Sequence, residues 1–382
     1  MIDPFARSGE NHRASVPLAM KVPLFRVHMP PPEVLLPRLE AVLYSGHVGD
    51  GATVRQFEDE FGKFIGNPRA LALSSGTAAL HTALLLAGAG QGDEVISTPM
   101  TAEPTNMAIL HSGARPVWAD VDPLSGNMDP QSLTDKITSR TKAVVVVHYA
   151  GIPVRLREIS DIAARHELPL IEDAAHALGA LYDGARIGTH SDYVVFSFQA
   201  IKHMTTGDGG MLLCGRAEDL PRARRIRWFG IDRSQPRTTV DVREVGYKYN
   251  TNNVVAAIGL VQLERIQSAI QRHMENGSFY DRALANVPGL RVCSFDSVAR
   301  PAYWIYTVLA ERRDDLARRL TECGIECSQV HRRNDLHPVF RDSRCELPGL
   351  DKYYSRMLHI PCGWWVTDEQ REYIADCVRA GW

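Results

Sequence analysis

Between about residues 67 and 214, short apolar runs alternate with helical patterns, and this alternation constrains the fold more than any other feature. The run Ala143–Val147 is rich in β-branched residues, which is typical of a strand buried on both faces. Strands that alternate with helices predict a mostly parallel sheet covered by helices on both sides. We therefore expect a three-layer α/β domain.

The expected elements follow from apolar periodicity and from capping residues. We expect strands at Ala70–Leu73, Glu94–Ser97, Pro116–Ala119, Ala143–Val147, Pro169–Ile171 and Tyr193–Phe198. We expect helices at Glu33–Leu43, Thr77–Ala87, Thr105–His111 and Leu156–Arg165, and one that Asp129 caps and that runs to about Ile137.

After about Gly230 the pattern changes. Helical periodicity over Val254–Ile270 leads into a long helix to about Asn286, and a smaller α+β domain is expected to follow. We divide the chain into an N-terminal arm at residues 1–21, a large α/β domain at 22–245 and a small C-terminal domain at 246–382.

Composition excludes several classes of protein. The 382 residues include 43 Lys and Arg against 45 Asp and Glu, so the basic excess of a nucleic-acid-binding protein or a polybasic membrane anchor is missing. No apolar run approaches the length of a membrane span, and the first twenty residues lack the apolar core of a signal peptide. Seven scattered cysteines without zinc spacing predict reduced thiols in the cytoplasm and no metal site.

A turn of small residues, Ser74-Ser75-Gly76-Thr77, joins a predicted strand to a predicted helix. Small residues let backbone N–H groups approach an anion, and the helix dipole adds to the attraction. The turn is either a phosphate-binding site or an ordinary helix cap.

Two acids, Glu172 and Asp173, end an apolar strand in the run Leu170-Ile171-Glu172-Asp173-Ala174-Ala175-His176. The carboxyl ends of strands are where α/β sheets place ligand contacts. The alternatives are a surface acid pair and a helix cap.

Lys202 follows the predicted strand Tyr193–Phe198 and precedes the glycine-rich turn Gly207-Asp208-Gly209-Gly210. A partly desolvated lysine is more often neutral and nucleophilic than an exposed one. The alternative is a surface lysine.

A phosphate-binding turn, a strand-end carboxylate and a semi-buried lysine, in that order, are what pyridoxal phosphate requires. The lysine forms a Schiff base with the cofactor aldehyde, and the carboxylate keeps the pyridine nitrogen protonated. The three motifs together therefore indicate a site for this cofactor.

With these motifs in place, the sequence resembles the DegT/DnrJ/StrS family of sugar aminotransferases, which are fold type I enzymes that use pyridoxal phosphate. The resemblance extends from about Val22 to the C-terminus. It is carried by Ser75-Gly76-Thr77-Ala78-Ala79-Leu80, Gly92-Asp93-Glu94-Val95, Glu172-Asp173-Ala174-Ala175-His176, Phe196-Ser197-Phe198 with Lys202, and Gly246-Tyr247-Lys248-Tyr249.

The resemblance implies a role for each matching residue. Lys202 would be the Schiff-base lysine and the acid and base of the proton shift. Asp173 would pair with the pyridine nitrogen, and His176 would contact the ring hydroxyl. The phosphate would be bound by the following residues: Gly76, Thr77, Ser197 and, from the neighbouring subunit, Lys248.

Three positions depart from the family pattern. Lys248 replaces an asparagine, and a lysine can still meet a phosphate as a point charge. Ala102 replaces the aromatic residue that stacks on the cofactor ring, so either another side chain covers the ring or that face is open to substrate. Gln199 replaces a histidine or tyrosine, which we interpret as substrate tuning.

The resemblance implies transfer of an amino group from L-glutamate to a nucleotide-linked keto-sugar, a step of amino-sugar biosynthesis. It also implies that the enzyme is a homodimer in the cytoplasm. A sugar dehydratase of the same family is one alternative, but those members replace the lysine with histidine. A non-catalytic regulatory member is another, although such a protein would not need Lys202, Asp173 and Ser197 together.

Further charged residues remain outside these motifs. Arg332 or Arg333 could meet a nucleotide diphosphate, or both could belong to a solvated charge run. Arg225 and Arg227 are expected to be surface charges on a helix.

Overall fold

The computed structural model describes residues 20–382, so the predicted N-terminal arm lies almost entirely outside the described residues. A seven-stranded sheet with strand order β1-β9-β8-β5-β4-β2-β3 forms its centre. Within the described residues the two pairings made by β9 are antiparallel, and the others in this sheet are parallel. The strands are β1 Ala70–Leu73, β2 Glu94–Ser97, β3 Arg115–Trp118, β4 Thr141–Val147, β5 Leu170–Asp173, β8 Tyr193–Ser197 and β9 Gly210–Cys214.

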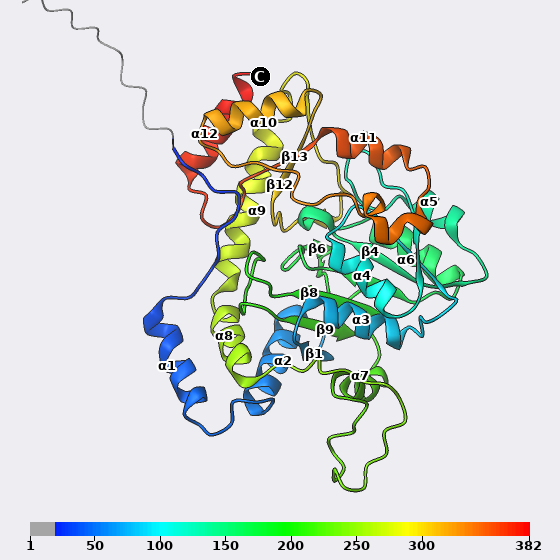
Figure 1. The fold of residues 1–382 in the computed structure, drawn as a ribbon. Coiled ribbons are helices and arrows are strands. Elements are labelled where there is room, and N and C mark those ends of the chain that lie inside the picture. The colour runs from blue at the N-terminus through cyan, green and yellow to red at the C-terminus, as the bar shows by residue number, and fades with distance from the viewer. Residues whose placement is uncertain (1–19) are drawn as a thin grey trace, which may run out of the picture.

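Helices cover both faces of the sheet (Figure 1). Val144 and Val146 of β4 belong to an apolar cluster on one face, while Ala143 and Val145 belong to a separate cluster on the other face. The side chains of a strand alternate between faces, so this β-branched run packs against helices on both sides. The three-layer α/β prediction is confirmed.

The helices are distributed between the two clusters. One cluster takes its helical residues from α2 Ala52–Ile65, α5 Pro130–Lys136, α6 Leu156–Arg165, α8 Asn253–Leu263 and α9 Ile266–Ala283. The other takes them from α3 Gly76–Leu86, α4 Glu103–His111 and α7 Asp219–Arg227. The remaining helix of this half of the chain is α1 Pro32–Leu43, which packs against α8.

A smaller α+β domain follows, as predicted, and α9 runs into it from the large domain (Figure 1). Its antiparallel sheet has the order β10-β12-β13. Its elements are β10 Leu290–Val292, β12 Tyr306–Ala310, α10 Arg313–Glu322, α11 Pro348–Arg356, β13 Met357–Ile360 and α12 Asp368–Arg379, with short 3-10 turns at Asn334–Leu336 and Pro338–Ser343. The predicted boundary at 245/246 stays a prediction.

The other short elements lie between the main ones. A 3-10 turn at Tyr149–Gly151 follows β4. A third small sheet, with order β11-β6-β7, contains β6 Leu181–Tyr182, β7 Ala185–Arg186 and β11 Ala299–Arg300. It joins a hairpin of the large domain to the segment that leads into β12.

Two sequence predictions need correction. The helix expected over Val254–Ile270 is interrupted at Glu264 and Arg265, so α8 packs against α1 and α2 while α9 packs against α12 of the small domain. Arg227 is buried rather than on the surface, because its guanidinium donates to Glu58 Oε1 at 2.6 Å and to the Ala72 carbonyl at 2.9 Å. The sequence pattern also missed α2 altogether.

Parallel pairing places three strand ends at the same edge of the sheet. Val147 at the end of β4 is in register with Asp173 at the end of β5, and Asp173 is in register with Val195 of β8. β8 then ends at Ser197. Residues at and after these ends therefore converge, although the sequence separates them by tens of residues.

Candidate active site

A cavity of about 400 Å³ opens at this edge of the sheet, and we refer to it as the sheet-edge cavity. Six of the seven predicted site residues line it, and they come from α3, the ends of β5 and β8 and the segments that follow them. These residues are Gly76, Thr77, Asp173, His176, Ser197 and Lys202. The seventh, Lys248, does not line the cavity of its own chain.

The first turn of α3 forms one wall. Ser75 is the N-cap, and its hydroxyl accepts a hydrogen bond from the Ala78 N–H at 3.1 Å. The first N–H groups of a helix have no acceptor within it, which leaves those of Gly76 and Thr77 available for an anion. A Cβ on Gly76 would lie 3.0 Å from Ser197 Cβ, so glycine allows α3 and β8 to approach closely. The turn is thus a helix cap and also has the form of a phosphate-binding site.

Asp173 ends β5 and is buried. The Thr105 hydroxyl donates to its Oδ2 at 2.7 Å, and the Ala175 N–H donates to its Oδ1 at 3.1 Å. The carboxylate is oriented by one bond to each oxygen and lines the cavity. The surface-pair alternative for this residue is therefore wrong.

Lys202 lies in the turn after β8, with its side chain partly accessible from the cavity. Burial lowers the pKa of its amine to about 8, against the opposing effect of the Asp173 charge. Its Nζ lies 4.0 Å from the centroid of the Trp304 ring. Within residues 20–382 the Lys202 side chain forms no ion pair. An amine with this pKa is neutral far more often near neutral pH than an exposed lysine, so the geometry suits a nucleophile and proton carrier.

Three planar rings stack beside the lysine. His176 is stacked on Trp304 with ring centroids 3.8 Å apart, and His331 is nearly parallel to both. Burial lowers the pKa of His176 well below its usual value and that of His331 to about 4, so both rings are neutral at physiological pH. His176 Nδ1 and His331 Nε2 are buried without a hydrogen-bond partner among the described residues. Both histidines line the cavity, so a ligand there could supply these missing partners.

Lys248 is exposed and lies opposite Trp228 in an isolated antiparallel bridge. Nearby, Tyr247 and Tyr249 stack on each other, and the Tyr249 carbonyl accepts from the Ser74 N–H at 2.7 Å. Lys248 is therefore placed beside the chain's own strand β1, outside the cavity. Contact with a phosphate in a second copy of the chain stays a prediction.

The two arginines of the loop after β12 and α10 differ in their partners. Arg333 donates to both Asp335 carboxylate oxygens at 2.8 Å and pairs with Asp351. Arg332 is exposed and, within the described residues, makes no ion pair. Of the two, Arg332 is the one available to a ligand.

The sequence reasoning gave no role to three side chains at the site: Thr105, Trp304 and His331. Thr105 was expected only as the start of a helix, and no local pattern connects it to Asp173, which lies 68 positions away. Trp304 reaches Lys202 from the segment before β12, and its indole N–H donates to the Ile201 carbonyl at 2.7 Å. Thr105 joins the site within the large domain, whereas only the packing of the small domain against the large one brings in Trp304 and His331.

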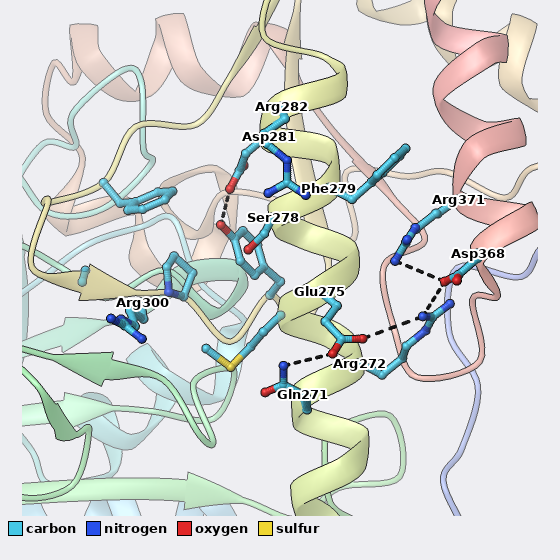
Figure 2. Close-up of a pocket in the computed structure, with 15 residues that line it drawn as sticks. Gln271, Arg272, Glu275, Ser278, Phe279, Asp281, Arg282, Arg300, Asp368 and Arg371 are labelled. Carbon is cyan, nitrogen blue, oxygen red and sulfur yellow. Dashed lines mark hydrogen bonds and ion pairs between the residues drawn. The ribbon is translucent and has the colours of Figure 1, made fainter.

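A larger hollow of about 690 Å³ lies along α9, where α9, the 295–303 segment and the start of α12 meet (Figure 2). We refer to it as the α9 hollow. Two of its arginines share one carboxylate: Arg272 pairs with Asp368 at 2.6 Å, and Arg371 pairs with the same carboxylate at 3.2 Å. It contains no lysine, so it lacks the chemistry of the sheet-edge cavity.

Two further findings concern residues 20–382. No cluster of His, Cys, Asp or Glu in this range has an arrangement that could hold a metal ion. No helix in the same range is long and apolar enough to cross a membrane.

The order and geometry of these groups agree with a comparison against known families. Residues 33–379 match the model of the DegT/DnrJ/EryC1/StrS aminotransferase family. The chain belongs to this family. It is a pyridoxal-phosphate-dependent aminotransferase with the fold of that family.

Relatives support the membership over nearly the full length. The chain is 34% identical to the dTDP-4-dehydro-2,3,6-trideoxy-D-glucose 4-aminotransferase of Saccharopolyspora spinosa, covering 89% of this chain and 92% of the relative. It is 34% identical to the spore coat polysaccharide biosynthesis protein SpsC of Bacillus subtilis, covering 88% and 91%. The crystal structure of the sugar aminotransferase CalS13 from Micromonospora echinospora superposes with a TM-score of 0.91, at 41% identity, covering 94% of this chain and all of that one.

The residues present fit the family's cofactor. The N–H groups at the start of α3 and the close approach that Gly76 permits suit a phosphate. The unpartnered His176 nitrogen and the oriented Asp173 carboxylate suit the polar atoms of a pyridine ring, and Lys202 lies in the same cavity. Ala102 also lines the cavity, so this wall lacks the family's aromatic residue, whereas His331 contributes a ring from the small domain.

Proposed function

We propose that this aminotransferase transfers an amino group from L-glutamate to a nucleotide-linked keto-sugar in amino-sugar biosynthesis. The observation that supports it most is the single cavity shared by Lys202, Asp173 and the first turn of α3. Relatives whose names state a substrate act on sugars linked to dTDP, UDP or GDP. The exposed Arg332, next to the cavity-lining His331, is a cation that could bind a diphosphate.

Pyridoxal phosphate, when bound, supplies an electron sink and a carrier for the amino group. Around it, Gly76, Thr77 and Ser197 would bind the phosphate, and His176 would meet the ring hydroxyl. Asp173 would hold a proton on the ring nitrogen, where the positive charge makes the ring a better electron sink. Lys202 would carry the proton between the two carbon atoms that exchange it, which requires an amine that titrates near the working pH.

The reaction is tested with L-glutamate and a panel of dTDP-, UDP- and GDP-linked 4-keto-6-deoxy sugars. We expect one nucleotide class to give both 2-oxoglutarate and an aminated sugar, detected by mass spectrometry in equal amounts. Lys202→Ala serves as the control that binds the same substrates without turnover. A protein that consumes glutamate but aminates no nucleotide-linked sugar, while it aminates a free sugar phosphate or a cyclitol, would contradict the nucleotide part of the proposal.

The sugar-dehydratase alternative is disfavoured by a lysine at position 202. The regulatory alternative predicts a protein whose bound cofactor does not respond to an amino donor. Bleaching of the cofactor absorbance by L-glutamate would reject that alternative. The cytoplasmic location remains a prediction.

We also propose a homodimer in which Lys248 of one subunit meets the phosphate bound by the other. Between α7 and Lys248 the chain forms a loop that extends away from the body of the molecule (Figure 1), and it exposes Val242 and Val245. An extended loop with exposed apolar side chains is suited to packing on a second copy. The exposed position of Lys248, outside its own cavity, is compatible with a contact in trans.

Light scattering tests the dimer, and a mixed dimer tests Lys248. In a dimer of one Lys248→Ala and one Lys202→Ala subunit, a trans contact leaves one site with both lysines intact. That site should bind cofactor as in the wild type, whereas the Lys248→Ala homodimer should bind it about ten- to hundredfold more weakly. Weak binding at the surviving Lys202 in the mixed dimer would place the contact in cis, and a catalytically active monomer would reject the dimer.

A further inference from the structure

Asn334 joins the two domains at the edge of the site. It lies in the loop between His331 and His337, and its side chain is fully buried. Its Nδ2 donates to the Thr101 carbonyl at 3.0 Å, and its backbone N–H donates to the Pro99 carbonyl at 2.9 Å. Its Oδ1 accepts from Asn106 Nδ2 at 2.8 Å. A residue of the small-domain loop is thus bonded twice to the segment that leads into α4 and once to α4 itself.

Asn106, the partner of Asn334, is equally well satisfied. Its Nδ2 also donates to the Thr98 carbonyl at 3.0 Å, and its Oδ1 accepts from the Ser97 hydroxyl at 2.8 Å. Asn334 Nδ2 also donates to the Arg332 carbonyl at 3.3 Å, so every donor of the two amides meets an acceptor. Neither side chain can flip without losing bonds in a buried place. Fully satisfied buried networks of this kind are rigid, so the position of Thr101 is determined by the loop.

From Thr101 the hydrogen bonds continue to Asp173. The Thr101 and Thr105 hydroxyl oxygens are 2.8 Å apart, and the Thr105 hydroxyl lies 2.7 Å from Asp173 Oδ2. An ionised carboxylate only accepts, so the single hydroxyl proton of Thr105 points to Asp173. Thr105 must then accept from Thr101. The direction of the chain is therefore Thr101 to Thr105 to Asp173, and both threonines are buried.

We propose that Asn334 is a positioning residue of this reaction: it holds Thr101, whose hydroxyl begins a relay through Thr105 that orients the Asp173 carboxylate toward the cofactor ring nitrogen. The proposal rests on the proposed function, because it assumes that the cofactor ring meets Asp173. If Asn334 has this role, Asp173 is oriented correctly only when the small-domain loop, which also carries His331, is packed against the large domain. We refer to Thr101, Thr105 and Asp173, which are joined by hydrogen bonds, as the relay.

A purely structural role for Asn334 makes a different prediction. If it only anchors the loop, its loss should act independently of Thr105. If it acts through the relay, the two losses should not add, because a relay that is already broken at Thr105 transmits nothing further from Asn334. A double-mutant cycle of Asn334→Ala and Thr105→Val therefore separates the two roles.

The cycle is measured on purified holoenzyme by kcat and, independently of turnover, by the dissociation constant for pyridoxal phosphate and the absorbance of the bound cofactor against pH. Loss of the hydrogen bond to the charged Asp173 in Thr105→Val should lower kcat by about tenfold or more. We expect Asn334→Ala to lower it about three- to tenfold alone, but by less than about twofold in the Thr105→Val background. The pH profile of the cofactor absorbance should shift in the same direction in Asn334→Ala, in Thr105→Val and in the double variant.

Asn276→Ala is the matched control. Asn276 is a fully buried amide that donates to the carbonyls of Cys362, Gly363 and Val366, none of which lines the sheet-edge cavity. Its effect should be the same factor in the wild-type and Thr105→Val backgrounds. If Asn334→Ala fails to fold, Thr101→Val replaces it, since this variant keeps the carbonyl that Asn334 binds and should reproduce the Thr105→Val profile.

The outcomes are distinct. Equal effects of Asn334→Ala in both backgrounds, or a Thr101→Val enzyme with wild-type cofactor absorbance and kcat, would overturn the relay while leaving the proposed function intact. A wild-type protein that binds the cofactor but aminates no sugar would overturn the proposed function, and the binding and absorbance measurements would still decide the relay.

Discussion

The sheet-edge cavity and the α9 hollow are both lined by ionisable side chains, and they differ in which kinds of side chain lack a partner within residues 20–382. In the α9 hollow, Arg272 and Arg371 share the Asp368 carboxylate (Figure 2). In the sheet-edge cavity, the Lys202 amine has a lowered pKa, and two histidine nitrogens lack partners among the described residues. In the part of the chain that the structure describes, the groups without a partner in the α9 hollow belong to arginines, including the buried Arg371 Nε, whereas those in the sheet-edge cavity belong to an amine and two imidazole rings. A desolvated amine and unpartnered imidazole nitrogens, rather than volume, identify the site here.

Replacing Lys202 tests this comparison most severely. Lys202→Ala removes the only side chain proposed to bond covalently to the cofactor, so we expect transamination to fall by on the order of a thousandfold or more. The absorbance of lysine-bound cofactor should disappear as well. The check is single-turnover transamination with the absorbance spectrum, and retention of the wild-type band would remove Lys202 from this role.

Replacing Asp173 should have the next largest effect. Asp173→Asn keeps the shape but removes the charge, and a hydrogen bond to a charged group contributes about 1.5–3 kcal/mol. We expect kcat to fall by about a hundredfold. Steady-state kinetics with a saturating amino donor make the measurement, and near-normal turnover would show that the carboxylate is not needed on the ring nitrogen.

The lowered pKa of Lys202 predicts a pH dependence for the cofactor-free protein. Only the neutral amine attacks the aldehyde, so the rate of covalent attachment should rise with pH, with its midpoint near a pH of about 8. An exposed lysine would instead titrate at about 10.4. The Asp173 charge raises the pKa of the amine, so Asp173→Asn should move the midpoint to lower pH. Stopped-flow absorbance measures both, and a midpoint above pH 10 would show that the amine is not desolvated.

The smallest effect is expected in the α9 hollow. Arg272→Ala removes two hydrogen bonds to the Val366 carbonyl, and the midpoint of thermal unfolding should fall by roughly 2–4 °C. Cofactor binding and kcat should stay within about twofold of the wild type. Arg282→Ala, which removes an exposed arginine with no ion pair among the described residues, is the control and should change neither quantity. A large loss of activity in either variant would mean that the hollow takes part in function.

The predicted and observed bounds of the helices and strands show which of them the local sequence pattern can predict. Strands β1 and β2 and helix α6 have the predicted bounds, because their periodicity and flanking residues are local properties of the chain. Helix α2 escaped prediction, although Phe57 and Phe61 on one face pack into the core. The break between α8 and α9 escaped as well, because it depends on what the two helices pack against.

The same contrast holds within the site. Gly76 begins a helix, Asp173 ends a strand and Lys202 follows one, so their convergence could be predicted from the topology of a parallel sheet. Arg227 could not be placed, since only the buried Glu58 across the fold accounts for its position beneath the surface. A charge that is paired at long range looks like any surface charge in the sequence.

By itself, the sequence determined the three-layer fold, the family and the residues that meet at the carboxyl edge of the sheet, because these depend on local periodicity and on the order of motifs. Tertiary structure alone decided the lowered pKa of Lys202, the stack of His176 on Trp304, and the hydrogen bonds from Asn334 through Thr101 to Asp173. Burial and hydrogen bonding act over a few ångströms between residues up to a few hundred positions apart, and no local pattern encodes such contacts.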